Sequence, residues 1–132
     1  MNTIPESLRD LLTDEKKAFL YLATIMKDGS PQVTPVWFNT DGSHILINSA
    51  MGRLKDKNMR ARSAVAVVIA DPANPYRYLQ IRGKVVEITL EGAEEHIDTL
   101  AFKYQGVPAY PYRRADEKRV TYKILPEHVD AH

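Results

Sequence analysis

The sequence predicts a single domain over residues 1–132 that is mainly β with flanking helices, an α+β chain built as an antiparallel barrel. Two Asp-Gly pairs, at 28–29 and 41–42, separate three apolar runs, and this arrangement is a strong hairpin signal. Strand–helix–strand alternations are too few for a doubly wound parallel sheet. Mostly antiparallel strands in one domain favour a closed or nearly closed barrel, because closure removes exposed strand edges.

A short helix is expected over residues 5–13. Pro5 suits the first helical turn, where its missing N–H costs nothing. One helical face would carry the leucines Leu8, Leu11 and Leu12. The apolar run 18–26 then predicts a strand. Because both of its alternating faces are apolar, we expect that strand to be buried on both sides.

The two Asp-Gly turns predict an antiparallel meander of the strands 18–26, 32–39 and 44–49. A polar segment rich in helix formers follows the meander. It predicts a helix over 52–62 that crosses to a β-branched strand at 64–70.

Two prolines and an asparagine predict a loop at 71–75. A long strand is expected over 76–90. It is interrupted at Gly83, where the sequence predicts a bulge or a sharp bend.

The segment 91–104 predicts a helix, since its apolar residues recur at helical spacing. These residues are Ala93, Ile97, Leu100, Ala101 and Tyr104. The proline-containing segment 106–114 predicts a loop. Clean alternation over 119–125 predicts a half-exposed final strand, with Arg119 on its polar side.

Composition narrows the possible chemistry. The chain has no cysteine, so disulfides and thiolate nucleophiles are excluded. Its four histidines lack metal-ligand spacing, and we expect no metal site. The net charge is +1, so phosphate binding requires a local cluster. Apolar runs fall short of the ~20 residues of a membrane helix, and no signal peptide is evident. We therefore expect a soluble cytoplasmic protein with no membrane or nucleic-acid partner.

The segment 52–62 carries the strongest chemical signal. It follows a strand and enters a helix, where backbone N–H groups and the helix dipole attract anions. Gly52 permits close backbone approach. Arg53 and Lys55 supply charges for a phosphate, and Asn58 supplies an amide donor. The alternative interpretation is a solvated basic helix face.

Two neighbouring segments predict a surface for a flat heterocycle. The first holds Pro35 inside an apolar strand, which indicates an edge, a bulge or a cavity; its residues are Thr34, Pro35, Val36 and Trp37. The second precedes the basic helix and consists of Asn48, Ser49, Ala50 and Met51. Alternatively, Trp37 is a core residue.

Two further aromatic groups leave alternatives open. Tyr76 and Tyr78 either stack on a ring system or form plain barrel surface. The loop 105–114 either walls a pocket with Tyr104, Tyr110 and Tyr112 or packs on its own tyrosines at the surface.

Together these segments resemble the pyridoxamine-5′-phosphate-oxidase-like, FMN-binding split-barrel family. Within it they are similar to the small branch that includes deazaflavin (coenzyme F-420) reductases. The resemblance spans roughly residues 8–125. The matching segments are 22–24, 28–37, 48–50, 52–55, 58–59 and 71–76.

The resemblance implies a split-barrel homodimer with its cofactors at the interface. Arg53, Lys55 and Asn58 would bind the phosphate, while residues 34–37 and 48–51 would line the ring and ribityl chain. Tyr76 and Tyr78 would lie near the partner's cofactor. The acidic tail of the deazaflavin would meet arginines, namely Arg60, Arg62, Arg113 and Arg114.

The chain departs from true pyridoxamine-5′-phosphate oxidases, because it lacks their arginine-rich C-terminal substrate segment. We therefore do not expect vitamin B6 oxidation. The prediction is an oxidoreductase that uses coenzyme F-420 or FMN to transfer hydride to or from a small unsaturated organic substrate. No catalytic residue is singled out. A cofactor carrier or sensor, and a nucleic-acid-binding barrel, are the alternative functions.

Overall fold

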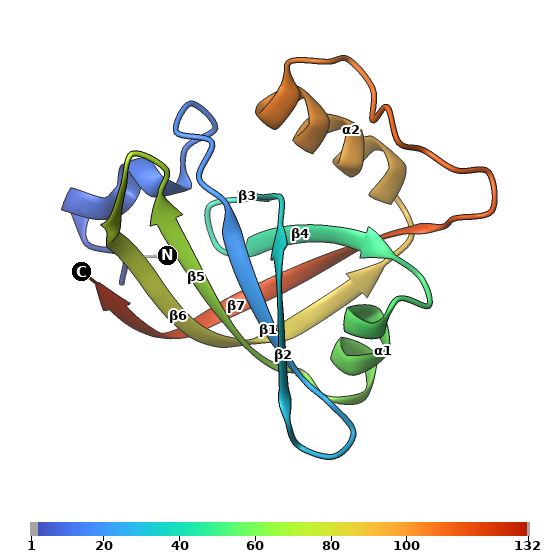
Figure 1. Ribbon diagram of the computed structural model, residues 1–132, viewed down its shortest axis with the longest axis horizontal. Helices are drawn as coiled ribbons and strands as arrows, with labels where there is room; N and C mark the ends of the chain where they lie inside the picture. The colour runs from blue at the N-terminus through green and yellow to red at the C-terminus, as the bar shows by residue number, and fades with distance from the viewer. Residues whose placement is uncertain (1–2, 132) are drawn as a thin grey trace.

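The computed structural model describes residues 3–131, which form one seven-stranded antiparallel sheet with three helical segments (Figure 1). The strand order is β2-β1-β5-β6-β7-β4-β3. The strands are β1 Leu20–Ile25, β2 Pro31–Val36, β3 Phe38–Thr40, β4 Ile45–Ala50, β5 Ala64–Asp71, β6 Asn74–Thr89 and β7 Arg119–Ala131. The helices are η1 Glu6–Leu12, α1 Leu54–Ala61 and α2 Ala93–Gln105. The predicted mainly β architecture is confirmed.

The sheet curls so that one short segment of chain supplies both of its ends. The two end strands β2 and β3 are separated in sequence only by Trp37. The predicted single strand 32–39 is therefore two strands, and the predicted three-strand meander is wrong at this point. Each half pairs through its own Asp-Gly turn, β2 with β1 and β3 with β4. Val36 and Phe38 both face the core on either side of Trp37.

The bulge predicted at Gly83 is confirmed. The pairing of β6 with β7 shifts register between Arg82 and Gly83, and Gly83 lies opposite Pro126. A Cβ atom at Gly83 would collide with the carbonyl oxygen of Leu125, so only glycine fits there without a shift of the backbone. The bulge also accommodates Pro126 inside β7, which consequently runs beyond the predicted end at 125.

The hairpin between β5 and β6 is tighter than the predicted loop 71–75. Asp71 belongs to β5 and Asn74 belongs to β6, so the turn is confined to two residues. The Asp71 carboxylate accepts a hydrogen bond from the Ala73 N–H at 2.8 Å and closes this turn. Asp71 also binds Arg77, which in turn binds Asp10 and fixes η1 on the barrel.

The strand β1 is buried on one face only, contrary to the sequence prediction. Leu20 and Leu22 are fully buried in the core, but Tyr21 is 44% exposed. Phe19, just before the strand, is 45% exposed. In a single copy of the chain this apolar outer face is uncovered.

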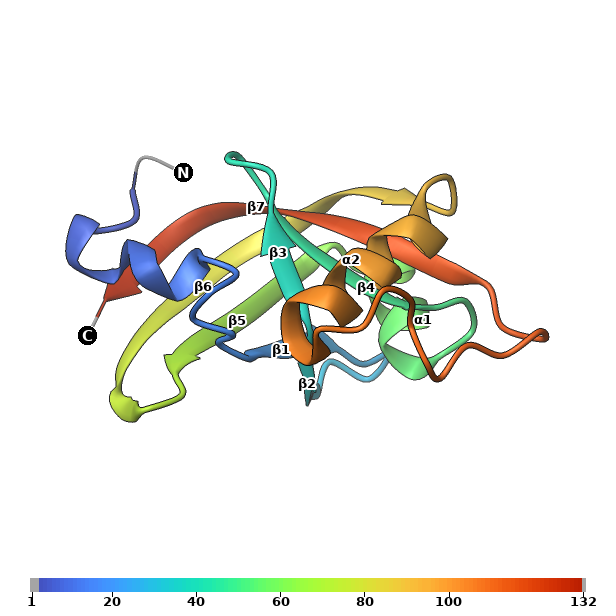
Figure 2. The same ribbon diagram turned by 90° about the horizontal axis from the view of Figure 1, so that it is seen from above.

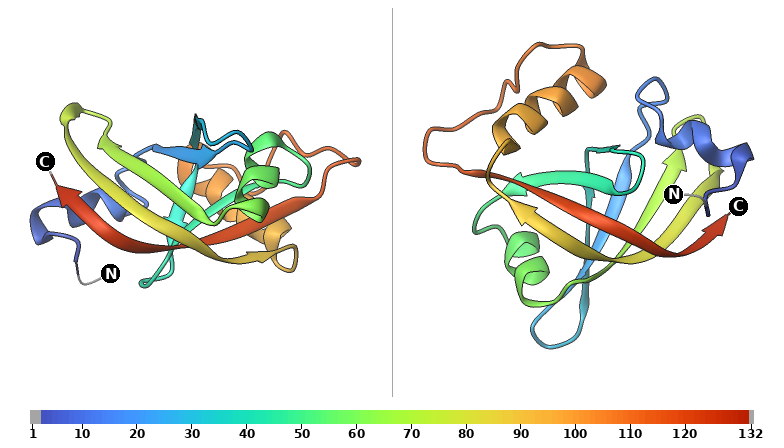
Figure 3. Two further views of the ribbon diagram at one scale, coloured as in Figure 1. Left: turned by 90° about the horizontal axis from the view of Figure 1, so that it is seen from below. Right: turned by 180° about the vertical axis from the view of Figure 1, so that it is seen from behind.

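The helices lie at separate places around the sheet (Figure 2). The segment η1 lies beside the C-terminal end of β7, while α2 covers part of β4 and β7 near the other end (Figures 2 and 3). The predicted apolar stripe of α2 is confirmed, since Ala93, Ile97, Leu100 and Ala101 are all buried. The helix α1 packs against β1. In the described chain, no helix is long and apolar enough to cross a membrane.

Candidate functional site

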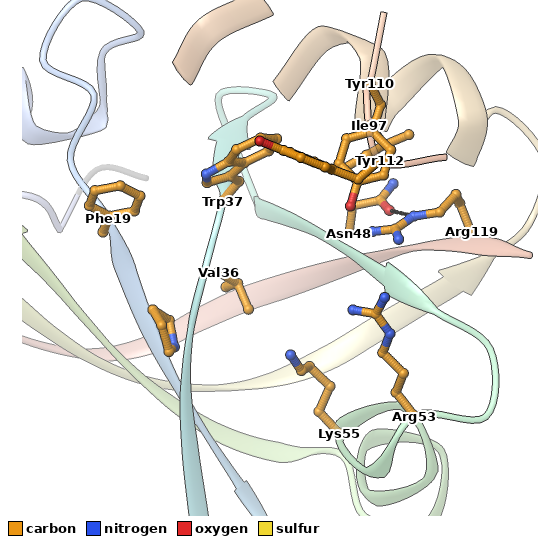
Figure 4. A pocket seen from close by; sticks show the side chains of 11 residues that line it. Phe19, Val36, Trp37, Asn48, Arg53, Lys55, Ile97, Tyr110, Tyr112 and Arg119 are labelled. Atoms are coloured by element: carbon orange, nitrogen blue, oxygen red, sulfur yellow. Dashed lines mark hydrogen bonds between the residues drawn. The ribbon is translucent and has the colours of Figure 1, made fainter. Parts of the chain in front are cut away.

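A cavity of about 300 Å³ opens where the two ends of the sheet meet, between the start of α1, the strand β4 and the helix α2 (Figure 4). One end is cationic and the other is aromatic. Its lining residues are Phe19, Pro35, Val36, Trp37, Asn48, Arg53, Lys55, Ile97, Tyr110, Tyr112 and Arg119. Six residues named by the sequence prediction are therefore brought together: Pro35, Val36, Trp37, Asn48, Arg53 and Lys55.

The cationic end is built by the turn that leads into α1. Gly52 has a φ of 90°, in the left-handed region that favours glycine. Its N–H donates to the Asp56 carboxylate at 2.9 Å. Asp56 is 2% exposed and also accepts hydrogen bonds from Tyr122 and Arg60. This buried carboxylate fixes the turn.

The same contact corrects the prediction for the backbone of this turn. The Gly52 N–H is engaged by Asp56, so it is not free to bind an external anion. Arg53 and Lys55 present their cationic side chains to the cavity. Arg53, just before α1, points toward Asn48 and Arg119, and Lys55, in the first turn of α1, points into the same cavity below Val36 (Figure 4).

Arg119 is a site residue that the sequence analysis missed. It is 5% exposed, whereas the alternation of 119–125 predicted an exposed side chain. Its Nε donates to the Asn48 side-chain oxygen at 2.9 Å, and its Nη1 donates to Glu117 at 2.6 Å. Its guanidinium carbon also lies 5.1 Å from the ring centroid of Tyr110.

Glu117 joins the two arginines of the cavity. One carboxylate oxygen accepts from Arg119 at 2.6 Å, and the other accepts from Arg53 at 3.0 Å. Burial opposes ionisation of Glu117, but hydrogen bonds from Arg119 and Arg53 prevail and lower its pKa. The carboxylate is thus held ionised between them.

Lys55 has a different environment. Within residues 3–131 its ammonium group makes no hydrogen bond or salt bridge. Burial lowers the pKa of Lys55, and repulsion from Arg53 and Arg119 lowers it further. An anion placed between these cations would relieve the repulsion and give the Lys55 ammonium group a hydrogen-bond acceptor.

A buried polar network supports the middle of the cavity. The Asn48 amide donates to the Ala93 carbonyl at 2.9 Å and lies 3.2 Å from His96 Nδ1. His96 Nε2 lies 2.9 Å from the Asn39 side-chain oxygen, which assigns the proton to Nε2. Burial and then Arg119 lower the pKa of His96 to about 4, so the imidazole is neutral near pH 7.

The aromatic end is a stack of rings. Tyr104 stacks on Trp37 at a centroid distance of 5.2 Å and on Phe19 at 5.4 Å. Tyr110 meets Trp37 edge-on at 6.2 Å, and Tyr112 meets Tyr110 at 5.5 Å. The interpretation of the loop 105–114 as a pocket wall therefore matches the geometry, since Tyr110 and Tyr112 line the cavity.

Asn58 lies outside the cavity lining. It is 3% exposed, and its amide donates to Thr24 at 3.0 Å and approaches the Met26 sulfur at 3.3 Å. Its oxygen accepts from Arg62 at 3.3 Å. These contacts attach α1 to β1. Asn58 thus stabilises the position of α1 and does not face the cavity.

The remaining predicted residues divide between the core, a side cavity and the outer surface. Thr34 and Ser49 have buried hydroxyl oxygens without a partner among the described residues. A second cavity of about 300 Å³ lies beyond Arg53 and is lined in part by Ala50, Met51 and Gly52. Tyr76 is 86% exposed at the start of β6, and Tyr78 is half-buried further along it; neither lines the main cavity.

The four arginines considered for an acidic tail are engaged locally. Arg60 binds Asp56, and Arg62 binds the carbonyl of Ile25. Arg113 binds Glu94 and Asp98, while Arg114 binds Asp116. No group of three or more histidines and carboxylates in residues 3–131 is arranged to hold a metal ion.

The family model described as pyridoxamine 5′-phosphate oxidase matches residues 4–132, nearly the whole chain. The chain belongs to the pyridoxamine 5′-phosphate oxidase family. The resemblance seen in the sequence is thereby confirmed, and so is the split-barrel fold. No curated protein sequence matches the chain.

Solved structures of this fold cover the chain almost completely. An F-420 reductase is 35% identical, with a TM-score of 0.84, and the match covers 96% of this chain and 98% of that one. HupZ from Group A Streptococcus is 20% identical, with a TM-score of 0.69 and coverage of 98% and 94%. A conserved hypothetical protein from Mycobacterium tuberculosis is 20% identical, with a TM-score of 0.74 and coverage of 98% and 84%. The last two likenesses concern the fold alone.

Proposed function

We propose that this member of the pyridoxamine 5′-phosphate oxidase family is an oxidoreductase that binds a flavin-type cofactor, coenzyme F-420 or FMN. The observation that carries the proposal is the polarity of one cavity, with Arg53 and Lys55 at one end and Trp37 near the other. A phosphate-bearing chain attached to a flat ring has the same polarity.

The residues present fit such a group. Lys55 lacks a partner within the described chain, and Arg53 presents a guanidinium that binds phosphate well. Pro35 and Val36 line the cavity between the two ends and Trp37 lines the aromatic end, where the ribityl chain and the ring would lie. When bound, the cofactor supplies hydride transfer to or from a small unsaturated organic substrate.

The residues of the chain hold and shield the reacting groups. Trp37, Tyr110 and Tyr112 form an aromatic wall against which the ring would lie. Arg119 keeps a positive charge in the middle of the cavity, anchored by Asn48 and Glu117. His96 lies behind Asn48, and its neutral state preserves the hydrogen-bond pattern that orients Asn48. No proton donor to the substrate is assigned.

The choice between the two cofactors favours the deazaflavin. The 35% identity to an F-420 reductase over nearly both full lengths supports coenzyme F-420. The 300 Å³ cavity is open, so the geometry of one copy admits either phosphate-bearing chain. The cytoplasmic location stays a prediction.

We further propose a homodimer that covers the apolar outer face of β2, β1 and β5. In this face Tyr21 lies opposite Pro35 on one side and Val68 on the other. Val33 is 64% exposed beside them. Phe19 and Pro35 also line the cavity, so a second copy on this face would border the cofactor.

Tyr78 extends the same face onto β6. It pairs with Ala70, which lies two residues after Val68 on β5 and therefore on the same outer face of the sheet. The proposed interface therefore reaches from β2 across to β6. This placement supports the role of Tyr78 near a partner's cofactor, and Tyr76 lies two residues before it at an exposed position.

Titration of the purified protein with oxidised coenzyme F-420, and separately with FMN, tests the proposal. Saturable quenching of the cofactor's fluorescence by the protein is expected, with tighter binding of F-420. Binding of FMN alone would move the chain to the flavin branch, and binding of neither would contradict the proposal. A bound cofactor that stays reduced with every acceptor offered would instead identify a carrier or sensor.

A further inference from the structure

Glu117 occupies the place that an anionic ligand would take on Arg53. It lies in the connection between α2 and β7 and is held on its other side by the buried Arg119. Its side chain is 14% exposed, against 47% for Arg53. The pair therefore joins an anchored carboxylate to a guanidinium that has solvent on one side.

Charge in the cavity is unbalanced. Arg53, Lys55 and Arg119 face one another, and among the described residues Glu117 is the one carboxylate that accepts a hydrogen bond from any of their side chains. Glu94 accepts only from the backbone N–H of Arg119, at 3.3 Å, and its side chain is paired with Arg113. The cluster therefore keeps a net positive charge and attracts an anion. Glu117 reduces that attraction and also occupies one of the donors that would bind the anion.

Arg53 also lies between two spaces. It lines the main cavity and the second cavity, where Glu117 is a neighbouring wall residue. A guanidinium on a flexible side chain can turn from Glu117 to a ligand on the other side without movement of the backbone. Arg119 cannot do so, because Asn48, Glu117 and the ring of Tyr110 surround it.

We propose that Glu117 is an internal counter-ion that a phosphate group must displace from Arg53, and that it thereby determines which anions the site accepts. Weak monoanions fail to displace the carboxylate, whereas a phosphate that also binds Lys55 succeeds. Arg119 retains Glu117 after the exchange, so the carboxylate is restored to Arg53 when the ligand leaves. This inference rests on the proposed phosphate role of Arg53 and Lys55.

The test measures binding of inorganic phosphate to the full-length protein by isothermal titration calorimetry. In Glu117→Gln the competing charge is gone, and phosphate should bind about two- to fivefold more tightly, the range of a partly exposed ion pair. Asp116→Asn is the matched control. It removes the same charge one position away, where Asp116 pairs with Arg114 at 3.2 Å and does not touch Arg53.

The gain should disappear in the background Arg53→Ala, because the competition acts through that guanidinium. If Glu117→Gln does not fold, Glu117→Asp replaces it, since the shorter side chain does not reach both arginines. Affinity in Glu117→Gln that equals the control, or falls below the wild type, overturns the inference.

Failure of the proposed function gives a different pattern. If phosphate binds the wild type and the Arg53→Ala variant equally, the phosphate site itself is wrong. If Arg53→Ala abolishes binding while Glu117→Gln brings no gain, the site stands and only the displacement is refuted. Absence of binding in both the wild type and Glu117→Gln refutes both.

Discussion

The rings of Tyr104 and Trp37 lie nearly parallel, 5.2 Å apart at an interplanar angle of 13°. The Tyr104 hydroxyl donates to the carbonyl of Ala18 at 2.6 Å, just before β1. Trp37 separates β2 from β3, so Tyr104 attaches α2 to both ends of the curled sheet. The stack of Tyr104 on Trp37 therefore also holds α2 against the ends of the sheet.

Replacement of Tyr104 should test how much these contacts contribute to stability. Tyr104→Ala is expected to lower the free energy of unfolding by about 2–3 kcal/mol, because a large, half-buried ring that stacks on Trp37 and Phe19 is removed. Tyr104→Phe keeps the stack and should cost about 0.5–1.5 kcal/mol for the lost hydrogen bond. Denaturant unfolding monitored by emission of Trp37, the single tryptophan of the chain, measures both.

Phe102→Ala is the matched control for this pair. Phe102 is on the same helix but is 66% exposed, so its loss should change stability by no more than about 0.5 kcal/mol. An equal loss for Phe102→Ala and Tyr104→Ala would contradict the structural role of the stack.

Arg53 and Lys55 should dominate cofactor affinity. Arg53→Ala and Lys55→Ala are each expected to weaken binding of the phosphate-bearing cofactor by about 1.5–3 kcal/mol, the value of a charged hydrogen bond. The comparison variant is Lys57→Ala, because Lys57 is exposed on the same helix and does not line the cavity. Fluorescence titration measures all three, and unchanged affinity in an Arg53→Ala, Lys55→Ala double variant would refute the assignment.

Lys103 should make stability depend on pH in the alkaline range. Burial lowers its pKa from 10.5 to about 8, although Asp14 partly offsets this effect. Between pH 8 and 10 the unfolded chain therefore binds more protons than the folded chain, and the free energy of unfolding rises with pH. The contribution is on the order of 2 kcal/mol.

Lys103→Met removes the titrating group and should abolish this part of the rise. Urea unfolding of the wild type and the variant at pH 7.5, 8.5 and 9.5 supplies the measurement, because these values begin just below the shifted pKa of about 8 and extend into the range where the rise is expected. Parallel curves for the two proteins would show that Lys103 does not contribute.

The apolar outer face should be required for dimer formation. Val33→Glu places a charge on β2 within this face and is expected to give monomers in sedimentation velocity. Phe102→Glu introduces the same charge at an exposed position on α2, away from the face, and should leave the dimer intact. A wild type that is monomeric at every concentration, or a Val33→Glu variant that stays dimeric, would contradict the proposed interface.

Local signals in the sequence predicted much of the fold. The Asp-Gly turns depend on a positive φ at Gly29 and Gly42, which few other residues adopt, so they are readable without tertiary context. Gly83 was readable as a glycine inside a strand, although the need for it comes from the close approach of the Leu125 carbonyl on β7. The break at Trp37 was not readable in this way, because Val36 and Phe38 continue the same alternation on both sides of it. The division of one apparent strand depends on the curvature of the whole sheet.

The candidate site was predictable only in part. Arg53 and Lys55 stood out because the turn at Gly52 precedes them. Arg119 was missed because the alternation of apolar and polar residues along a strand does not show which face of the strand a helix covers. The helix α2 packs on β7, and Arg119 is buried there. Asn58 was assigned to the phosphate on spacing, while its contacts with Thr24 and Met26 depend on a strand more than thirty residues away in the sequence.

The continuity of β2 and β3 through Trp37 has a consequence for dynamics. The end strands β2 and β3 are joined through Trp37. If these two strands move apart and the barrel opens between them, Trp37 must move and the cavity wall that it forms must deform. A ligand bound against that wall would disfavour this separation of β2 and β3. Amide hydrogens of the flanking strands β1 and β4 should therefore exchange with solvent more slowly in the liganded protein, although most of them do not border the cavity.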